Sequence, residues 1–212
     1  MKSAPKTAVR TIWKTPDHHS PLSRFLNEIY PLSQQAISCI DEGSHPLEVP
    51  KGKFLIRPNQ ESTALYLILK GVVRAYIVED GKEITTWINE ENEVVGSIRS
   101  LGLKIAPREY IQAIENCSLI AISYELVEYL YSSFPEANVV GRILLEENYR
   151  GAEERAYICR IPSAEKKYIR FVQTNPGLID RISLKYIASY LNMTNETLSR
   201  IRRRLTTAVR KK

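Results

Sequence analysis

The chain has 212 residues, 43% of them apolar and 25% charged, a composition typical of a globular protein that can bury a core in one or two domains. Residues 160–212 contain thirteen Lys and Arg against three Asp and Glu, a net charge of +10, whereas residues 1–159 contain seventeen against twenty-one, a net charge of −4. A basic C-terminal quarter on a mildly acidic body favours a nucleic-acid-binding or acidic-surface-binding module joined to another domain. A solvated basic face is the alternative.

Cysteine usage and hydropathy argue against several classes of protein. Cys39, Cys117 and Cys159 lie far apart and form no CxxC pair, so neither a zinc site nor a disulfide framework is predicted. The N-terminus lacks the charged-then-apolar pattern of a signal peptide, and no apolar run approaches the ~18 residues that a membrane span needs. We expect a cytoplasmic protein with no cofactor, no metal and no membrane partner.

The N-terminal half changes from a helical to a β pattern. Residues 1–20 are polar and punctuated by Pro, which predicts a loose arm. Apolar residues then recur at helical spacing from Pro21 to about Glu42. Residues 47–124 contain short β-branched and aromatic runs separated by turn signals, which favours an antiparallel β sandwich or jelly roll. Within them, VRAYIV and EITTWI flank Asp80-Gly81 and predict a β-hairpin.

The C-terminal half is helical. Residues 124–131 have a helical pattern, and Glu136 to about Cys159 can form one long helix because this stretch contains no Pro. Pro162 ends that helix, and Ser163 can cap another through about Thr174.

The stretch SLKYIASYLNMTNETLSRIRRRL, residues 183–205, contains two short helical patterns joined by Leu191-Asn192-Met193. Ala188 is a small residue where the helices would cross, and Thr194 is a good N-cap for the second helix, so a helix-turn-helix is predicted. Inward-facing Leu198, Ile201 and Leu205 would leave a polar outer face. The predicted DNA-reading residues are Thr194, Asn195, Glu196, Ser199, Arg200 and Arg203. The predicted phosphate contacts are Arg202, Arg204, Arg210, Lys211 and Lys212.

The segment LKYIASYLNMTNETLSRIRRRL resembles the recognition motif of the Crp/Fnr superfamily of bacterial transcription regulators, which has an x-E-T-x-x-R core. Upstream, LYLILKGVVRAYIVEDGKEITTWINEENEVVGS is similar to the cyclic-nucleotide-binding jelly roll of that family. The resemblance implies that Glu196 and Arg200 read bases beside a variable Asn195, and that the long helix forms a homodimer on a near-palindromic operator. RNA polymerase is a further partner that it implies. The DNA motif is similar to that of regulators in Bacteroidetes.

A stripe formed by Val140, Leu144, Gly151 and Ile158 is the expected dimer seam, although Glu147 and Glu154 interrupt it.

The chain departs from the family pattern in its ligand cassette. Where cyclic-AMP-binding members place a Glu after the turn glycine, here Gly96, this chain has Ser97, and Pro107 stands in the place of the phosphate-binding Arg. Arg108 is one position late and is followed by Glu109, although Arg99 and Arg108 could both reach an anion in a rearranged loop. We therefore expect no response to cyclic AMP and leave another small ligand, or none, open. The residues that could form a ligand site are Gly96, Ser97, Arg99 and Arg108.

We also expect neither iron–sulfur sensing nor metal or haem sensing, and we expect no full β-hairpin wing after the second helix of the motif. Three isolated cysteines cannot supply the four thiolates of an iron–sulfur sensor. His18 and His19 in the arm are expected to face solvent rather than a metal or haem. Only TTAVRKK follows Leu205, which leaves no room for the β-hairpin wing that relatives carry. The basic tail could replace the wing's phosphate contacts.

We predict an α+β protein with an N-terminal antiparallel β jelly roll, a long dimerisation helix and a C-terminal helix-turn-helix domain lacking a full β wing. The expected divisions are an arm (1–20), a sensor domain (21–134), the dimerisation helix (135–160) and the DNA-binding domain (161–212). The expected function is sequence-specific DNA binding in transcription regulation. The alternative is a signalling module that binds a small ligand and controls a partner protein. No GxSxG, Walker loop, Cys/His pair or acidic metal cluster is present, so an enzyme is not expected.

Overall fold

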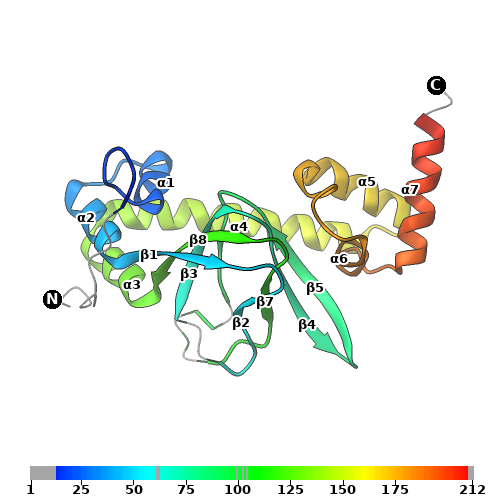
Figure 1. Cartoon of the computed structure of the whole chain (residues 1–212), viewed down its shortest axis with the longest axis horizontal. Coiled ribbons are helices and arrows are strands. Elements are labelled where there is room, and N and C mark those ends of the chain that lie inside the picture. Colours follow the sequence, from blue (N-terminus) through cyan, green and yellow to red (C-terminus); the bar gives the residue numbers. More distant parts are fainter. Residues whose placement is uncertain (1–12, 61–62, 99, 102, 104, 210–212) are drawn as a thin grey trace. The chain divides into compact units, whose positions relative to one another are not determined.

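The computed structural model describes residues 13–60, 63–98, 100, 101, 103 and 105–209 (Figure 1). The chain divides into two compact units, one made of residues 1–74 and 88–148 and the other of residues 75–87 and 149–212. The predicted α+β class is confirmed, because antiparallel sheets are followed by a run of helices.

Two four-stranded sheets form the β roll. The first has the order β1-β8-β3-β6, with strands β1 (Ser44–Val49), β8 (Cys117–Ser123), β3 (Ala64–Lys70) and β6 (Val94–Val95). Strand β8 pairs antiparallel with β1, where Leu47 faces Leu119, and with β3, where Leu67 faces Ile120. Because β8 has a neighbour on each side, its residues are almost all buried, as expected of a central strand.

The second sheet has the order β2-β7-β4-β5. Its strands are β2 (Phe54–Ile56), β7 (Tyr110–Ala113), β4 (Val73–Glu79) and β5 (Lys82–Asn89). The hairpin predicted from Asp80-Gly81 is confirmed, because both residues have positive φ, 50° and 73°, as a type I′ turn requires. Strand β5 is the outermost strand of this sheet.

Three helices and the start of a fourth pack against the first sheet. The amphipathic stretch from Pro21 is divided at Pro31 into α1 (Pro21–Ile29) and α2 (Gln34–Gly43), because Pro cannot donate the hydrogen bond that would continue the helix. Helix α3 (Tyr124–Ser133) and the long helix α4 (Pro135–Arg160) follow the β roll. Buried side chains from α1, α2, α3, β3 and β8 form one apolar core.

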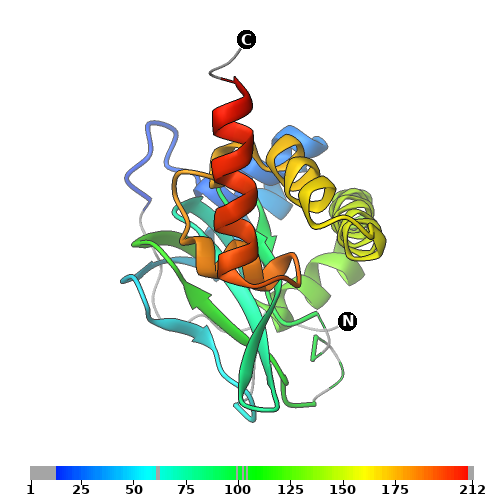
Figure 2. The ribbon, with the colours of Figure 1, turned by 90° about the vertical axis from the view of Figure 1, so that its right-hand side faces the viewer.

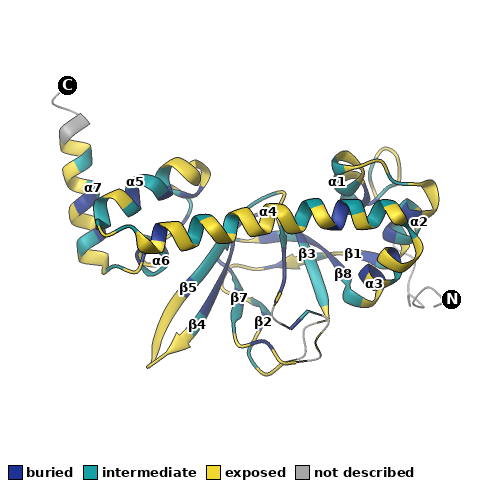
Figure 3. Cartoon of the chain, turned by 180° about the vertical axis from the view of Figure 1, so that it is seen from behind, coloured by how far each residue is buried: buried dark blue, intermediate teal, exposed yellow. Residues whose placement is uncertain are grey.

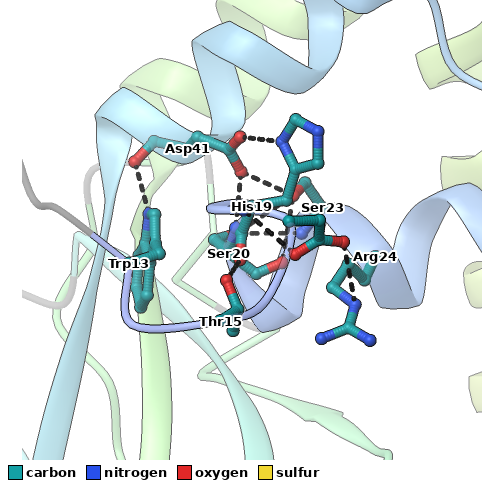
Figure 4. Close-up of polar contacts among 8 residues, drawn as sticks. Trp13, Thr15, His19, Ser20, Ser23, Arg24 and Asp41 are labelled. Carbon is teal, nitrogen blue, oxygen red and sulfur yellow. Dashed lines mark hydrogen bonds and ion pairs between the residues drawn. The ribbon is translucent and has the colours of Figure 1, made fainter.

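The described part of the N-terminal arm is packed, so the expectation of a loose arm is wrong for residues 13–20 (Figure 4). Asp41 of α2 holds this segment: its Oδ1 accepts from the Ser20 N–H at 2.8 Å and from the Ser23 hydroxyl at 2.5 Å, and its Oδ2 lies 2.7 Å from His19 Nδ1. Its carbonyl oxygen accepts from Trp13 Nε1 at 2.9 Å. Asp41 therefore orders, through its carboxylate and its backbone carbonyl, a segment whose composition predicts a loose arm. Residues 1–12 of the predicted arm lie outside the described residues.

Replacing Asp41 with Ala should lower the free energy of unfolding by about 2 kcal/mol, because it leaves the buried Ser20 N–H without its acceptor and removes one partner of Ser23. Denaturant unfolding followed by circular dichroism measures this loss. The control is Glu146→Ala, which removes an exposed carboxylate bonded to Arg142 and should cost about 0.5 kcal/mol or less. Equal losses in the two variants would show that Asp41 does not anchor the arm.

Candidate nucleic-acid interface

The second unit contains the predicted helix-turn-helix. Helix α5 (Ala164–Thr174) and a short 3-10 turn (Pro176–Leu178) precede α6 (Leu184–Tyr190) and α7 (Asn195–Val209). The turn between α6 and α7 has Asn192 at φ 51°, and the Met193 N–H donates to the Ala188 carbonyl at 3.0 Å. Ala188 is buried, as expected where two helix backbones approach closely.

The N-terminus of α7 is capped as predicted. The Thr194 hydroxyl accepts from the Thr197 N–H at 3.2 Å. Hydrogen bonds from its own backbone N–H and from the Thr194 side chain lower the pKa of Glu196. Its carboxylate is therefore ionised at neutral pH and acts only as a hydrogen-bond acceptor.

Helix α7 presents the predicted reading residues on one exposed face. Leu198 and Ile201 are 0% and 5% exposed, so the helix packs through that side. Five exposed side chains follow one another at spacings of three or four residues over the rest of the helix surface: Asn195, Glu196, Ser199, Arg200 and Arg203. A cap, a carboxylate acceptor and guanidinium donors thus share a surface that can enter a major groove.

The residues predicted to contact phosphates differ in their burial and in their partners within the chain. Arg202 is half-buried, and Arg204 forms an ion pair with Glu165 of α5, so a protein carboxylate already partners its guanidinium. Arg210, Lys211 and Lys212 lie outside the described residues. Helix α7 continues through Val209. The described residues after the turn are therefore helical and form no β wing.

Helix α5 is fastened to the C-terminal part of α4. Arg170 donates two hydrogen bonds to Glu154, at 2.6 and 2.8 Å, and these bonds lower the pKa of the carboxyl. Tyr190 of α6 packs against Phe171 with ring centroids 5.4 Å apart, and burial raises the pKa of Tyr190 to about 12. Because Arg170 and Glu154 are partly exposed, their pair contributes orientation more than stability.

The candidate ligand residues follow β6. A Cβ on Gly96 would lie 2.5 Å from Leu65 Cδ2, so a side chain at this position would require the Leu65 side chain to shift. Ser97 is buried, and its hydroxyl has no hydrogen-bond partner among the described residues. Arg108 is exposed, Pro107 is buried, and Arg99 lies outside the described residues. The four described positions, Gly96, Ser97, Pro107 and Arg108, thus provide one buried hydroxyl and no buried cation.

The first unit also contains an apolar cavity of about 80 Å³, which the sequence did not reveal. Its lining includes Leu22, Leu65, Tyr131, Val140 and Leu144. A cavity this small with apolar walls cannot solvate a cyclic phosphate, because an ionised group needs a cation or several donors. The cavity can hold only a small apolar group.

Helix α4 has two apolar stripes, and two residues of the stripe predicted as the seam are buried within the chain. Val140 and Ile158 are 4% and 0% exposed and pack within the chain. A second stripe, of exposed apolar and small side chains, has alternating spacings of four and three residues: Leu145, Tyr149, Ala152, Ala156 and Cys159. Figure 3 shows how much of α4 is exposed.

Within the described ranges, no helix is long and apolar enough to cross a membrane. Nor do the described His, Cys, Asp and Glu residues form a group of three or more that could bind a metal ion.

Comparisons with known proteins find similar sequences and similar structures. Residues 46–134 match the family profile of the cyclic nucleotide-binding domain. The chain is 22% identical over 190 residues to the anaerobic regulatory protein of Aggregatibacter actinomycetemcomitans, covering 81% of this chain and 71% of that protein. It is 29% identical over 97 residues to the HTH-type transcriptional regulator ArcR of Staphylococcus epidermidis, a match that spans 46% of this chain and 42% of ArcR.

Among solved structures, a protein described as a transcriptional regulator of the Crp/Fnr family from Eubacterium rectale superposes with a TM-score of 0.67 at 19% identity. The superposition covers 85% of this chain and 88% of that chain. None of these matches supports the narrower resemblance to regulators of Bacteroidetes.

Proposed function

We propose that this chain, which contains a cyclic nucleotide-binding domain and has the fold of the Crp/Fnr regulators, is a sequence-specific DNA-binding transcription regulator of that type. The observation that carries the proposal is the surface of α7, where Asn195, Glu196 and Arg200 are exposed while Leu198 and Ile201 are buried. A basic surface that served only for adhesion would not require this set of donors and acceptors on one face.

Each reading residue has a chemical role in a major groove. The Arg200 guanidinium can donate two hydrogen bonds to guanine O6 and N7. The Glu196 carboxylate can accept from a cytosine amine, and the Asn195 amide can pair with adenine. Arg203 lies one turn beyond Arg200, and the role proposed for half-buried Arg202 is a contact with the phosphate backbone. The tail residues Arg210, Lys211 and Lys212 would add phosphate contacts.

Selection from random duplexes with the purified full-length protein tests this function. We expect a near-palindromic sequence whose half-sites are about one helical turn apart, because a two-fold dimer presents two copies of α7. Enrichment of no sequence would refute the proposal and would favour a module that controls a partner protein.

Arg200→Ala should weaken binding to the selected duplex by about 1–3 kcal/mol and leave binding to a scrambled duplex nearly unchanged. Arg202→Ala is the matched control. It should weaken both duplexes alike and reduce the slope of log affinity against log salt by about one, because a phosphate contact releases counterions whatever the sequence. Salt titrations of both variants measure the difference. If Arg200→Ala weakened both duplexes equally, Arg200 would be a phosphate contact.

The exposed stripe on α4 is the proposed dimer seam. Ala152 and Ala156 are small enough for close approach of two helices, and Leu145 and Tyr149 provide apolar area at the adjoining positions. The stripe has the seven-residue repeat of a coiled coil.

Ala152→Lys should weaken the dimer by about a hundredfold or more, because it brings two like charges together in an apolar seam. Glu147→Lys is the control. It makes a larger charge change within the stripe first expected from the sequence, and it should leave the dimer intact. Sedimentation equilibrium at micromolar concentration distinguishes the two outcomes. Dissociation of the Glu147→Lys protein alone would restore the original stripe as the seam.

The chain is further proposed to act without cyclic AMP. Ser97 and Pro107 supply neither the carboxylate for a ribose hydroxyl nor the cation for a cyclic phosphate, and Arg108 faces solvent. Calorimetry with cyclic AMP should therefore show no binding tighter than about 1 mM, and the nucleotide should not change affinity for the selected duplex. A micromolar dissociation constant would contradict this expectation and would direct attention to Arg99 and Arg108.

A further inference from the structure

The β4–β5 hairpin contacts the helix-turn-helix within the second unit (Figures 1 and 2). The Ser189 hydroxyl of α6 accepts from the Thr85 N–H at 2.9 Å and donates to the Glu83 carbonyl at 3.0 Å. Both groups belong to the outer edge of β5, the outermost strand of its sheet. The Ser189 hydroxyl therefore bonds two backbone groups of β5 that a neighbouring strand would otherwise bond.

The hairpin also forms one wall of a polar groove of about 610 Å³. On the hairpin side the groove is lined by Glu79, Asp80, Lys82 and Glu83. On the other side it is lined by the turn and the first residues of α7, including Met193, Thr194 and Asn195. The acidic tip thus faces the part of the helix-turn-helix that the proposed function brings to DNA.

The charge of the hairpin decides between two roles. A hairpin beside a recognition helix could act as a wing and contact phosphates, which would require cationic side chains. Residues 79–83 instead carry three carboxylates and one ammonium, a net charge of −2. Carboxylates beside the path of a DNA backbone repel it, so the hairpin in this position opposes binding.

Lys185 of α6 lines the same groove. Its ammonium shares the groove with the hairpin carboxylates, so the closed arrangement also offsets a cation that could otherwise approach a phosphate. Moving the hairpin away would remove the repulsion and, at the same time, expose the ammonium of Lys185.

We infer that Ser189 is a latch that holds the acidic β4–β5 hairpin against the helix-turn-helix, and that the latched arrangement is an autoinhibited state from which DNA binding requires release. The inference rests on the proposed function. The latch is weak enough to open, because two hydrogen bonds between uncharged groups contribute only modestly to stability. The alternative is that Ser189 only protects the edge of β5 from pairing with strands of other chains.

Ser189→Ala tests the latch. Alanine has a higher helix propensity than serine, so α6 should remain folded, and the melting temperature checks this. We expect roughly tenfold tighter binding to the selected duplex, because the closed state loses both bonds. Amide exchange at Thr85 should be faster in the variant without DNA, and DNA should accelerate that exchange in the wild-type protein. The control is Thr174→Ala, which removes a hydroxyl bonded to the Arg170 carbonyl in the same unit and should change neither readout.

A second variant separates charge from the hydrogen bonds. Glu79→Gln combined with Asp80→Asn removes two carboxylates and keeps the turn, because Asn tolerates the positive φ of residue 80. This variant should bind both the selected and the scrambled duplex more tightly, while exchange at Thr85 stays slow.

The outcomes distinguish the inference from the proposed function. A wild-type protein that selects no duplex overturns both. A protein that selects a duplex, but whose Ser189→Ala variant binds it no tighter, overturns only the inference. Faster exchange at Thr85 with unchanged affinity would assign Ser189 to edge protection, and weaker binding would make the hairpin a supporting wing.

Discussion

The burial of Leu198 and Ile201 is the constraint on which the proposed interface depends. These two side chains fix the rotation of α7 about its axis, because turning the helix would expose apolar area and bury guanidinium groups. Once the rotation is fixed, Asn195, Glu196 and Arg200 can only face outward. The chemistry of the outer face is thus a consequence of apolar packing on the inner one.

Charge then distinguishes surfaces that geometry alone would treat alike. The second unit contains both a basic recognition helix and an acidic hairpin tip, and the groove between them is lined by both signs of charge. Arg204 is paired with Glu165, so a cation that the sequence offers to phosphates has a carboxylate partner within the chain. The number of cations in a segment therefore overstates how many are ready to meet DNA.

Helix α4 carries two apolar stripes for two different purposes. One stripe supplies Val140 and Ile158 to the interior of the chain, and the other leaves Leu145, Tyr149 and the small Ala152 and Ala156 exposed. A single helix can do both because positions displaced by one residue lie about 100° apart around its axis. The interrupting carboxylate Glu154 is explained by its bond to Arg170, which uses the same helix to hold α5.

The sequence by itself determined the elements whose signals are local. The Asp80-Gly81 hairpin, the cap at Thr194, the crossing at Ala188 and the end of α4 before Pro162 each depend on neighbouring residues, and the structure has all four. Strand β1 begins at Ser44, three residues before the predicted β region, because Pro46 weakens the pattern there, and it forms as an edge strand paired with β8. Tertiary structure alone decided that Asp41 orders residues 13–20, that the exposed stripe of α4 starts at Leu145, and that Ser189 meets β5. Each of these depends on contacts between residues far apart in the chain, and periodicity along the sequence does not encode which of two faces a neighbour will cover.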